Sequence, residues 1–269
     1  MTDRSFAARA RRFFSGYWSL GALRNLPGRE LSRASSPDQL VHPFDITHRV
    51  DTSGLFYAED LSSGHANDQH SAGYYATAPS LLHGAIARWS SSILSVGLAL
   101  NDYTLLDIGC GKGRVVLLAS ECAFRTIVGV ELNPSLARIA NKNLKRWMRK
   151  PRACGDVKIV NDDFFSVAIP DGPVVLYLFN SFEHELVQRL LDRLLEISAT
   201  RSHPIDLIYI HPEFGEIFRE TPRAAILADE EISFSAEDAA ADAFGVSFDR
   251  CSIYRLEGLL PFKNGKLPA

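Results

Sequence analysis

Residues 105–114 read Leu-Leu-Asp-Ile-Gly-Cys-Gly-Lys-Gly-Arg, where a short apolar run ends in Asp107 and passes into three alternating glycines. The apolar residues 115–119 follow directly. Glycine lets the chain turn sharply and lets a ligand lie against the backbone, where a Cβ atom would clash. A helix that begins after the turn would offer its unpaired N–H groups at the same place. This stretch therefore predicts a buried strand, a ligand-binding turn and a helix.

Two classes of nucleotide ligand bind at turns of this kind. The dinucleotide fingerprint G-x-G-x-x-G/A needs a small last residue, but this position holds Arg114 when counted from Gly109 and Val116 when counted from Gly111. The run Gly-x-Gly-x-Gly with an acid two residues before it instead resembles motif I of the class I S-adenosylmethionine (SAM) methyltransferases. A pyrophosphate favours a positive helix end without a nearby anion, whereas SAM carries an ammonium and a sulfonium, which tolerate Asp107.

Strand and helix patterns alternate from residue 104 onward, which indicates an α/β fold. Helical spacing of apolar residues covers 113–121, 136–149 and 183–198, and a helix-rich segment covers 79–100. The pattern predicts a Rossmann-like, seven-stranded, mostly parallel sheet with helices on both faces and an N-terminal helical and loop lid. The predicted strands are 104–108, 126–131, 157–160, 174–179, 207–210, 253–256 and, less regularly, 232–234.

Three acids follow three successive strands, namely Asp107, Glu131 and Asp163. The carboxyl ends of parallel strands meet at one edge of a sheet, and ligands bind there. A carboxylate at Glu131 can accept two hydrogen bonds from a ribose diol. Asp163 offers an acceptor for an adenine amine, and Phe164 beside it offers a ring on which the base can stack.

The resemblance extends beyond the glycine run. Residues 130–134 (Val-Glu-Leu-Asn-Pro) and 161–165 (Asn-Asp-Asp-Phe-Phe) look like the next motifs of class I methyltransferases. Residues 50–54 and 70–77 resemble the lead-in of an uncharacterised bacterial group of these enzymes, except that this chain lacks the proline of its Tyr-x-Pro-Thr. The motif after the second strand and the Tyr…Thr lead-in are also similar to the non-SET histone lysine methyltransferases and to a family that modifies a lysine of mitochondrial ATP synthase. Those relatives suggest protein amino groups as targets.

The resemblance implies SAM as cofactor, S-adenosylhomocysteine as its product, and a methyl acceptor that can be a protein lysine, a small amine or a hydroxylated metabolite. The methyl acceptor is expected beyond the fourth strand, where Asn180 is the catalytic candidate. Tyr74, also a catalytic candidate, is expected to close over the methionine end of SAM together with Thr77. Asn180 is similar to the first residue of the Asn/Asp-Pro-Pro-Tyr/Phe motif of amine and amide methyltransferases, but both prolines are absent, which leaves N-, O- and C-methylation open. The expected cofactor-binding residues are Thr77, Asp107, Gly109, Cys110, Gly111, Gly113, Glu131, Leu132, Asp163, Phe164 and Asn180.

Two other functions stay open at this point. One is a NAD(P)-dependent oxidoreductase, which the large residue Arg114 disfavours. The other is a module that binds SAM without catalysis. The histidines at 42, 48, 65 and 70 match no metal-ligand spacing, so no metal site is expected.

Length and composition predict one large domain and an extension. The 269 residues divide into a basic aromatic extension (1–43), a lid and lead-in helix (44–100), a SAM-binding domain (101–260) and a tail (261–269). The net charge of −3 gives no overall signature of nucleic-acid binding. Residues 1–40 nevertheless hold seven arginines against three acids, which leaves nucleic acid or an anionic surface open as a partner.

Several smaller expectations concern location and exposure. The four cysteines show no C-x-x-C spacing, and no apolar run approaches membrane-spanning length, so a cytoplasmic protein with free thiols is expected. The acid-rich residues 229–242 are expected to form a solvated loop. Lys112 and Arg114 are expected to face solvent.

Overall fold

The computed structural model describes residues 41–56, 58–70, 73–94 and 97–257. The predicted extension and tail therefore lie almost wholly outside the described residues. The helices are α2 (Pro43–His48), α3 (Pro79–Leu94), α4 (Arg114–Ala119), α5 (Pro134–Trp147), α6 (His184–Ala199), α7 (Glu216–Arg219) and α8 (Ala236–Ala241). The strands are β1 (Leu55–Phe56), β2 (Tyr74–Tyr75), β3 (Thr104–Ile108), β4 (Thr126–Glu131), β5 (Val157–Asn161), β6 (Val174–Phe179), β7 (Ile205–Ile210), β8 (Ala224–Ser233) and β9 (Phe248–Leu256).

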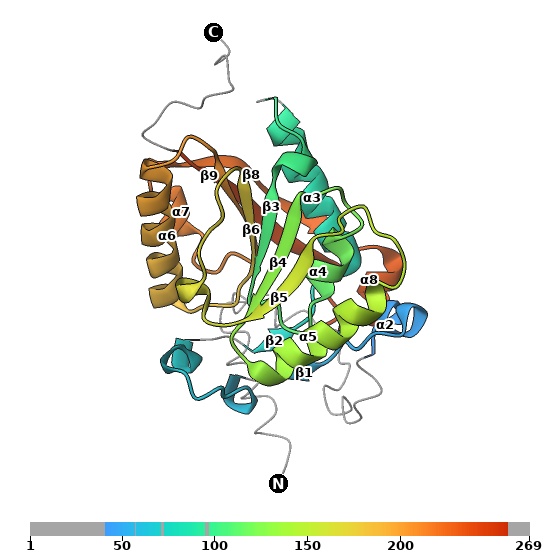
Figure 1. Ribbon diagram of the computed structural model, residues 1–269. Helices are drawn as coiled ribbons and strands as arrows, with labels where there is room; N and C mark the ends of the chain where they lie inside the picture. The colour runs from blue at the N-terminus through green and yellow to red at the C-terminus, as the bar shows by residue number, and fades with distance from the viewer. Residues whose placement is uncertain (1–40, 57, 71–72, 95–96, 258–269) are drawn as a thin grey trace.

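A seven-stranded sheet forms the centre of the structure, in the order β5-β4-β3-β6-β7-β9-β8. Its first five strands are parallel, and β9 is antiparallel to both of its neighbours. Helices α3, α4 and α5 cover one face, and α6 and α7 cover the other (Figure 1). The predicted Rossmann-like fold is confirmed. Strand order reverses between β3 and β6, and a ligand is expected at the carboxyl ends of strands beside such a switch point.

The segment after β4 shows how the sequence fixes the entry to a helix. Asn133 caps α5 because its side chain accepts hydrogen bonds from the N–H groups of Ser135 and Leu136. Pro134 follows in the first turn, where its missing N–H costs nothing. The Asn133 amide also donates to the carbonyl of Leu61 (2.8 Å), so the same residue ties α5 to the segment that precedes the sheet.

The prediction that residues 229–242 form a solvated loop is wrong. Asp229 lies in β8, where it pairs with Arg250 (2.7 Å), and Asp238 lies buried in α8. The Asp238 carboxylate accepts from the N–H of Ser80 (2.7 Å). Local charge counts cannot reveal these partners, because the donors come from distant parts of the chain.

Residues 41–56, 58–70 and 73–78, which we call the lead-in segment, lie across the carboxyl ends of the parallel strands (Figure 1). The segment buries Arg114, contrary to the prediction that this side chain faces solvent. The guanidinium donates to Thr52 Oγ1 (2.7 Å) and Ser53 Oγ (3.0 Å). Asp45 completes this network, since its carboxylate accepts from the N–H groups of both residues (2.6 Å each) and lies 3.7 Å from the guanidinium.

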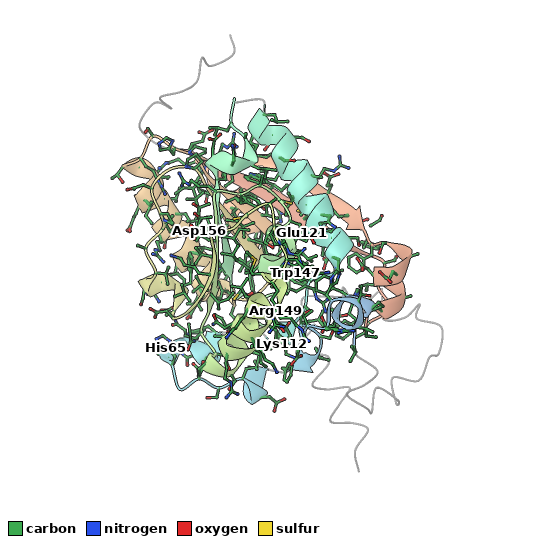
Figure 2. The ribbon with its side chains drawn as sticks, turned by 45° about the vertical axis from the view of Figure 1, so that its right-hand side comes forward. His65, Lys112, Glu121, Trp147, Arg149 and Asp156 are labelled. Carbon is green, nitrogen blue, oxygen red and sulfur yellow. The ribbon has the colours of Figure 1, made fainter. Side chains whose placement is uncertain are left out.

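Lys112 is buried for the same reason, so its predicted exposure is also wrong. Its ammonium contacts Asp51 Oδ1 and the carbonyl of Ser53, both at 2.7 Å, and lies 5.0 Å from the centre of the Phe56 ring. Figure 2 shows Lys112 beside α5 on the side of the molecule where Trp147 also lies. Two cations of the glycine turn therefore hold the lead-in segment against the sheet.

The buried Asp45–Arg114 pair yields a stability prediction. Asp45→Ala removes an acceptor from two backbone N–H groups and leaves the guanidinium buried without its carboxylate. Removing one partner of a buried pair costs about 3–5 kcal/mol, and we expect a loss of this size in urea unfolding. The matched control is Glu230→Ala, because Glu230 pairs with the exposed Arg88, and an exposed pair is worth about 1 kcal/mol or less. Equal losses in the two variants would contradict the assignment.

Candidate functional site

The glycine turn lies at the switch point and is shaped by backbone conformation. Gly109, Gly111 and Gly113 all have positive φ, at 70°, 55° and 88°. A Cβ atom on Gly111 would lie 2.1 Å from Cε2 of Tyr74, so only glycine lets that ring lie on the turn. The N–H of Gly111 donates to Glu131 Oε2 (2.7 Å), which links the turn after β3 to the end of β4. The turn is therefore fixed from both sides.

A solvent-open cavity, which we call the β4 cavity, lies beside this turn. It brings together the predicted residues Glu131, Leu132, Asp163 and Phe164. Each oxygen of the buried Glu131 carboxylate accepts one backbone hydrogen bond, from Gly111 or Asn133, and retains a lone pair for a ribose hydroxyl. Burial raises the pKa of Glu131.

Asp163 and Phe164, the two groups predicted to contact adenine, both line the β4 cavity, although Phe164 is more deeply placed than a surface platform would be. Phe164 is buried in the core beneath the cavity, with the guanidinium of Arg193 at 5.0 Å from its ring centre. Asp163 accepts from Asn67 Nδ2 (3.1 Å) and from the N–H of Phe165 (3.1 Å). Stacking of a base on Phe164 stays a prediction, and the aromatic neighbour Phe182 also lines this cavity.

A second cavity, which we call the β3 cavity, lies on the other side of the glycine turn. The predicted residues Tyr74, Thr77, Asp107, Gly109 and Cys110 line it. Sequence reasoning missed several further residues of this lining, among them Tyr75, Tyr177, Phe179 and Ser181. The last two belong to residues 179–181 at the end of β6, where only Asn180 was chosen as a candidate.

Asp107 is the chemically unusual group of the β3 cavity. Its side chain is 3% exposed, and Oδ2 has no hydrogen-bond partner among the described residues. Burial, and after it the negative charge of Glu131, raises the pKa of Asp107 well above its ordinary value. An unpaired buried carboxylate is costly unless a cation or donor reaches it. The ammonium of a methionine moiety supplies both, so the residues present fit SAM.

Tyr74 covers the turn with its ring rather than with its hydroxyl. The hydroxyl donates to the carbonyl of Thr52 (2.6 Å), and burial raises the pKa of Tyr74. Thr77 is buried beside it, where its Oγ1 receives the hydroxyl of Tyr177 (3.3 Å) and its carbonyl receives Arg114 Nη1 (3.3 Å). Both residues line the β3 cavity together with Asp107. Their closure over the methionine end and a catalytic role for Tyr74 stay predictions.

Asn180 adopts the left-handed backbone conformation (φ 37°), which is strained for a residue other than glycine. Its amide donates to Glu213 Oε2 (3.2 Å), and its carbonyl oxygen accepts from the hydroxyl of Tyr209 (3.4 Å). The side chain is thus bound by the end of β7 and the loop after it. Its predicted part in SAM binding and catalysis stays a prediction.

Comparison with known proteins agrees with this geometry. Residues 105–200 match a family described as a methyltransferase domain. With the fold and the site, this match identifies the chain as a SAM-dependent methyltransferase. A protein-lysine N-methyltransferase of Saccharolobus islandicus is 29% identical over 117 residues, which cover 43% of this chain and 70% of that protein. The adenine nucleotide translocase lysine N-methyltransferase of Mus musculus is 42% identical over 64 residues, which cover 24% of this chain and 27% of that protein.

Two solved structures are similar to this methyltransferase over about two thirds of its length. An RNA methyltransferase from Salinibacter ruber in complex with S-adenosyl-L-homocysteine is 19% identical with a TM-score of 0.40, covering 68% of this chain and 97% of that one. The magnesium protoporphyrin IX methyltransferase of Synechocystis with bound SAM is 10% identical with a TM-score of 0.46, covering 66% and 79%.

Two other expectations concern metals and membranes. In the described part of the methyltransferase, no group of three or more His, Cys, Asp or Glu side chains is arranged to hold a metal ion. Within the same residues no helix is both long and apolar enough to cross a bilayer. The cytoplasmic location and any role of the basic extension in binding nucleic acid stay predictions.

Asp107 gives a prediction that separates binding from folding. Folding raises the pKa of Asp107 above its ordinary value of 3.8. The protonated carboxyl therefore contributes its full stabilisation below pH 3.8, and this stabilisation is lost as the pH rises through the raised pKa. Asp107→Asn carries no charge, so without SAM we expect it to unfold at higher denaturant concentration than the natural protein at pH 8, with a smaller difference at pH 5. Calorimetry should show SAM binding weakened at least about tenfold, since a buried charge pair is lost.

Asp192→Asn is the control for this experiment, because Asp192 is exposed on α6. It should change neither the stability nor the affinity for SAM. If Asp107→Asn lowered stability at pH 8 and left SAM binding intact, Asp107 would be a structural residue and not a cofactor ligand.

Gly111→Ala tests the close approach of Tyr74 to the turn. The added methyl group would displace the Tyr74 ring and would also strain the backbone, and a strained conformation costs about 1–3 kcal/mol. Gly245→Ala is matched in backbone conformation (φ 69°) but has no atom within 4 Å of the added Cβ. We expect Gly111→Ala to abolish measurable SAM binding in calorimetry and Gly245→Ala to preserve it. Retained binding in Gly111→Ala would show that the Tyr74 contact is dispensable.

Proposed function

We propose that this methyltransferase transfers the methyl group of SAM to an aliphatic amine, namely the side-chain amino group of a lysine in a protein. Two relatives with partial sequence similarity are named as lysine N-methyltransferases. The proposal rests chiefly on one observation, which is the composition of the space next to the β3 cavity.

A third cavity, which we call the β9 cavity, shares four wall residues with the β3 cavity: Tyr75, Ala76, Arg114 and Phe179. Its remaining walls combine aromatic rings and carboxylates, mostly from the chain between β8 and β9, with His42 and the aliphatic residues Ala78, Leu81 and Val246. An ammonium ion is attracted to aromatic faces and to carboxylates, and an aliphatic stem packs against the same rings. The aromatic and acidic wall residues are Tyr75, Phe179, Phe234, Phe244, Asp238, Asp242 and Asp249.

The carboxylates of the β9 cavity are held in place by the protein. Asp242 Oδ2 accepts from the N–H groups of Phe244 (2.8 Å) and Val246 (3.0 Å). Asp249 Oδ1 lies 3.0 Å from Nδ1 of His211. Burial raises the pKa of Asp242. Preorganised negative groups of this kind stabilise a positive charge without having to reorganise.

Methyl transfer from a sulfonium needs positioning more than acid–base chemistry. When bound, SAM supplies a methyl group activated by its positive sulfur. The residues of this chain would anchor the donor at Asp107 and Glu131 and orient the acceptor in the β9 cavity. They would also exclude water, because Tyr74 and the lead-in segment cover the glycine turn.

Tritiated SAM tests the proposal directly. We expect label to enter a degenerate peptide library that contains one lysine per peptide, and to co-elute with methyl-lysine after acid hydrolysis. The same library with norleucine in place of lysine is the control and should remain unlabelled.

Two results would contradict the proposal. Label that base releases as methanol would indicate a methyl ester and hence an oxygen acceptor. Tight binding of SAM without label in either library or in a bacterial lysate would instead indicate a module without catalysis.

A further inference from the structure

We infer that the Tyr75 hydroxyl receives the acceptor nitrogen and aims its lone pair at the methyl group. This inference rests on the proposed amine acceptor and assigns a role to a residue that the glycine-run motifs do not include. Tyr75 belongs to β2 and is a wall residue of both the β3 cavity and the β9 cavity. It therefore lies at the boundary that an acceptor must reach to meet the donor.

The Tyr75 hydroxyl is oriented by two fixed contacts. It donates to Asp242 Oδ1 (3.0 Å) and accepts from the N–H of Ala243 (3.0 Å). The ring packs edge-on against Phe244, with 5.1 Å between ring centres. These contacts come from one short segment after α8, so the hydroxyl and the segment hold each other in place.

The direction of the hydroxyl proton determines what Tyr75 can bind. A phenol has one proton and two lone pairs. The proton is used by Asp242 and one lone pair by Ala243, so the remaining lone pair can accept an N–H but the group cannot donate. Burial raises the pKa of Tyr75, which keeps the phenol protonated. The hydroxyl can thus accept a hydrogen bond from an amine N–H. It cannot donate a hydrogen bond to a substrate group that needs one.

This arrangement suits the charge changes of the reaction. The lysine ammonium first loses a proton to water, and one N–H of the neutral amine then donates to Tyr75. As the new N–C bond forms from the nitrogen lone pair, the C–S bond breaks and its electron pair stays on sulfur. The positive charge passes from sulfur to nitrogen, where the Tyr75 oxygen and the Asp242 carboxylate stabilise it.

The neighbouring candidates are less suited to this role. The Tyr74 hydroxyl donates to the carbonyl of Thr52. The Asn180 amide contacts Glu213 and Tyr209. Tyr75 alone among these three lies on a wall common to the β3 and β9 cavities.

The test uses the protein saturated with S-adenosylhomocysteine and n-butylammonium as a mimic of the lysine side chain. Binding is measured by calorimetry for the natural protein and for Tyr75→Phe, which removes only the hydroxyl. Loss of one hydrogen bond should weaken butylammonium binding about fivefold and leave the affinity for S-adenosylhomocysteine unchanged. Tyr103→Phe is the matched control, because its hydroxyl also donates to a buried aspartate, Asp206 (3.2 Å), away from these cavities.

A second variant tests the orientation of the proton. In Asp242→Asn the side-chain carbonyl oxygen can accept the N–H groups of Phe244 and Val246 that Asp242 now accepts. The side-chain amide nitrogen would then donate to the Tyr75 oxygen. The hydroxyl proton of Tyr75 would turn toward the cavity. We expect this reversal to weaken butylammonium binding at least as much as Tyr75→Phe does. n-Butanol, which has no charge, should not bind measurably to any of the proteins.

The outcomes separate this inference from the proposed function. Unchanged butylammonium binding in Tyr75→Phe, or no binding by the natural protein, would overturn the role of Tyr75. Methyl-lysine in the peptide library would still support the amine acceptor in that case. Fivefold weaker binding with the Tyr103→Phe protein unaffected would support the role.

Discussion

The burial of the Arg114 guanidinium is the constraint on which the site depends. It joins the first helix after the glycine turn to Thr52, Ser53 and Thr77 of the lead-in segment, with Asp45 as its counter-charge. The lead-in segment then carries Tyr74 over the turn and Tyr75 to the boundary of the β9 cavity. A single charge on α4 thus positions residues that line both the β3 cavity and the β9 cavity.

The donor edge is organised around negative charge rather than positive charge. Asp107 and Glu131 are both buried, and the negative charge of Glu131 adds to the electrostatic cost of ionising Asp107. Burial alone makes the ionised Glu131 costly. Two backbone N–H groups stabilise the Glu131 carboxylate by donating hydrogen bonds to it. Asp107 Oδ2 has no such contact among the described residues. The folded protein therefore holds buried negative charge that a cationic ligand would neutralise. This explains why an ammonium and a sulfonium fit this edge, whereas a pyrophosphate does not.

The sequence predicted the parts of the fold that depend on local pattern. The ranges of β3, β4 and β6 were right to the residue, because buried parallel strands read as unbroken apolar runs. The exposure of Lys112 and Arg114 was wrong, since their partners lie about 60 positions away in the chain. Tyr75 was missed for the same reason: only the folded chain brings it to Asp242, 167 residues later.

The two halves of the site come from different parts of the chain, and this explains why the family match identifies the donor but not the acceptor. The matched residues 105–200 include the glycine turn, Glu131 and Asp163. The walls of the β9 cavity come mostly from outside them, from the lead-in segment and from the chain between β8 and β9. Under the proposed function, the choice of acceptor therefore depends on residues such as Tyr75 and Asp242, which lie outside the matched residues 105–200.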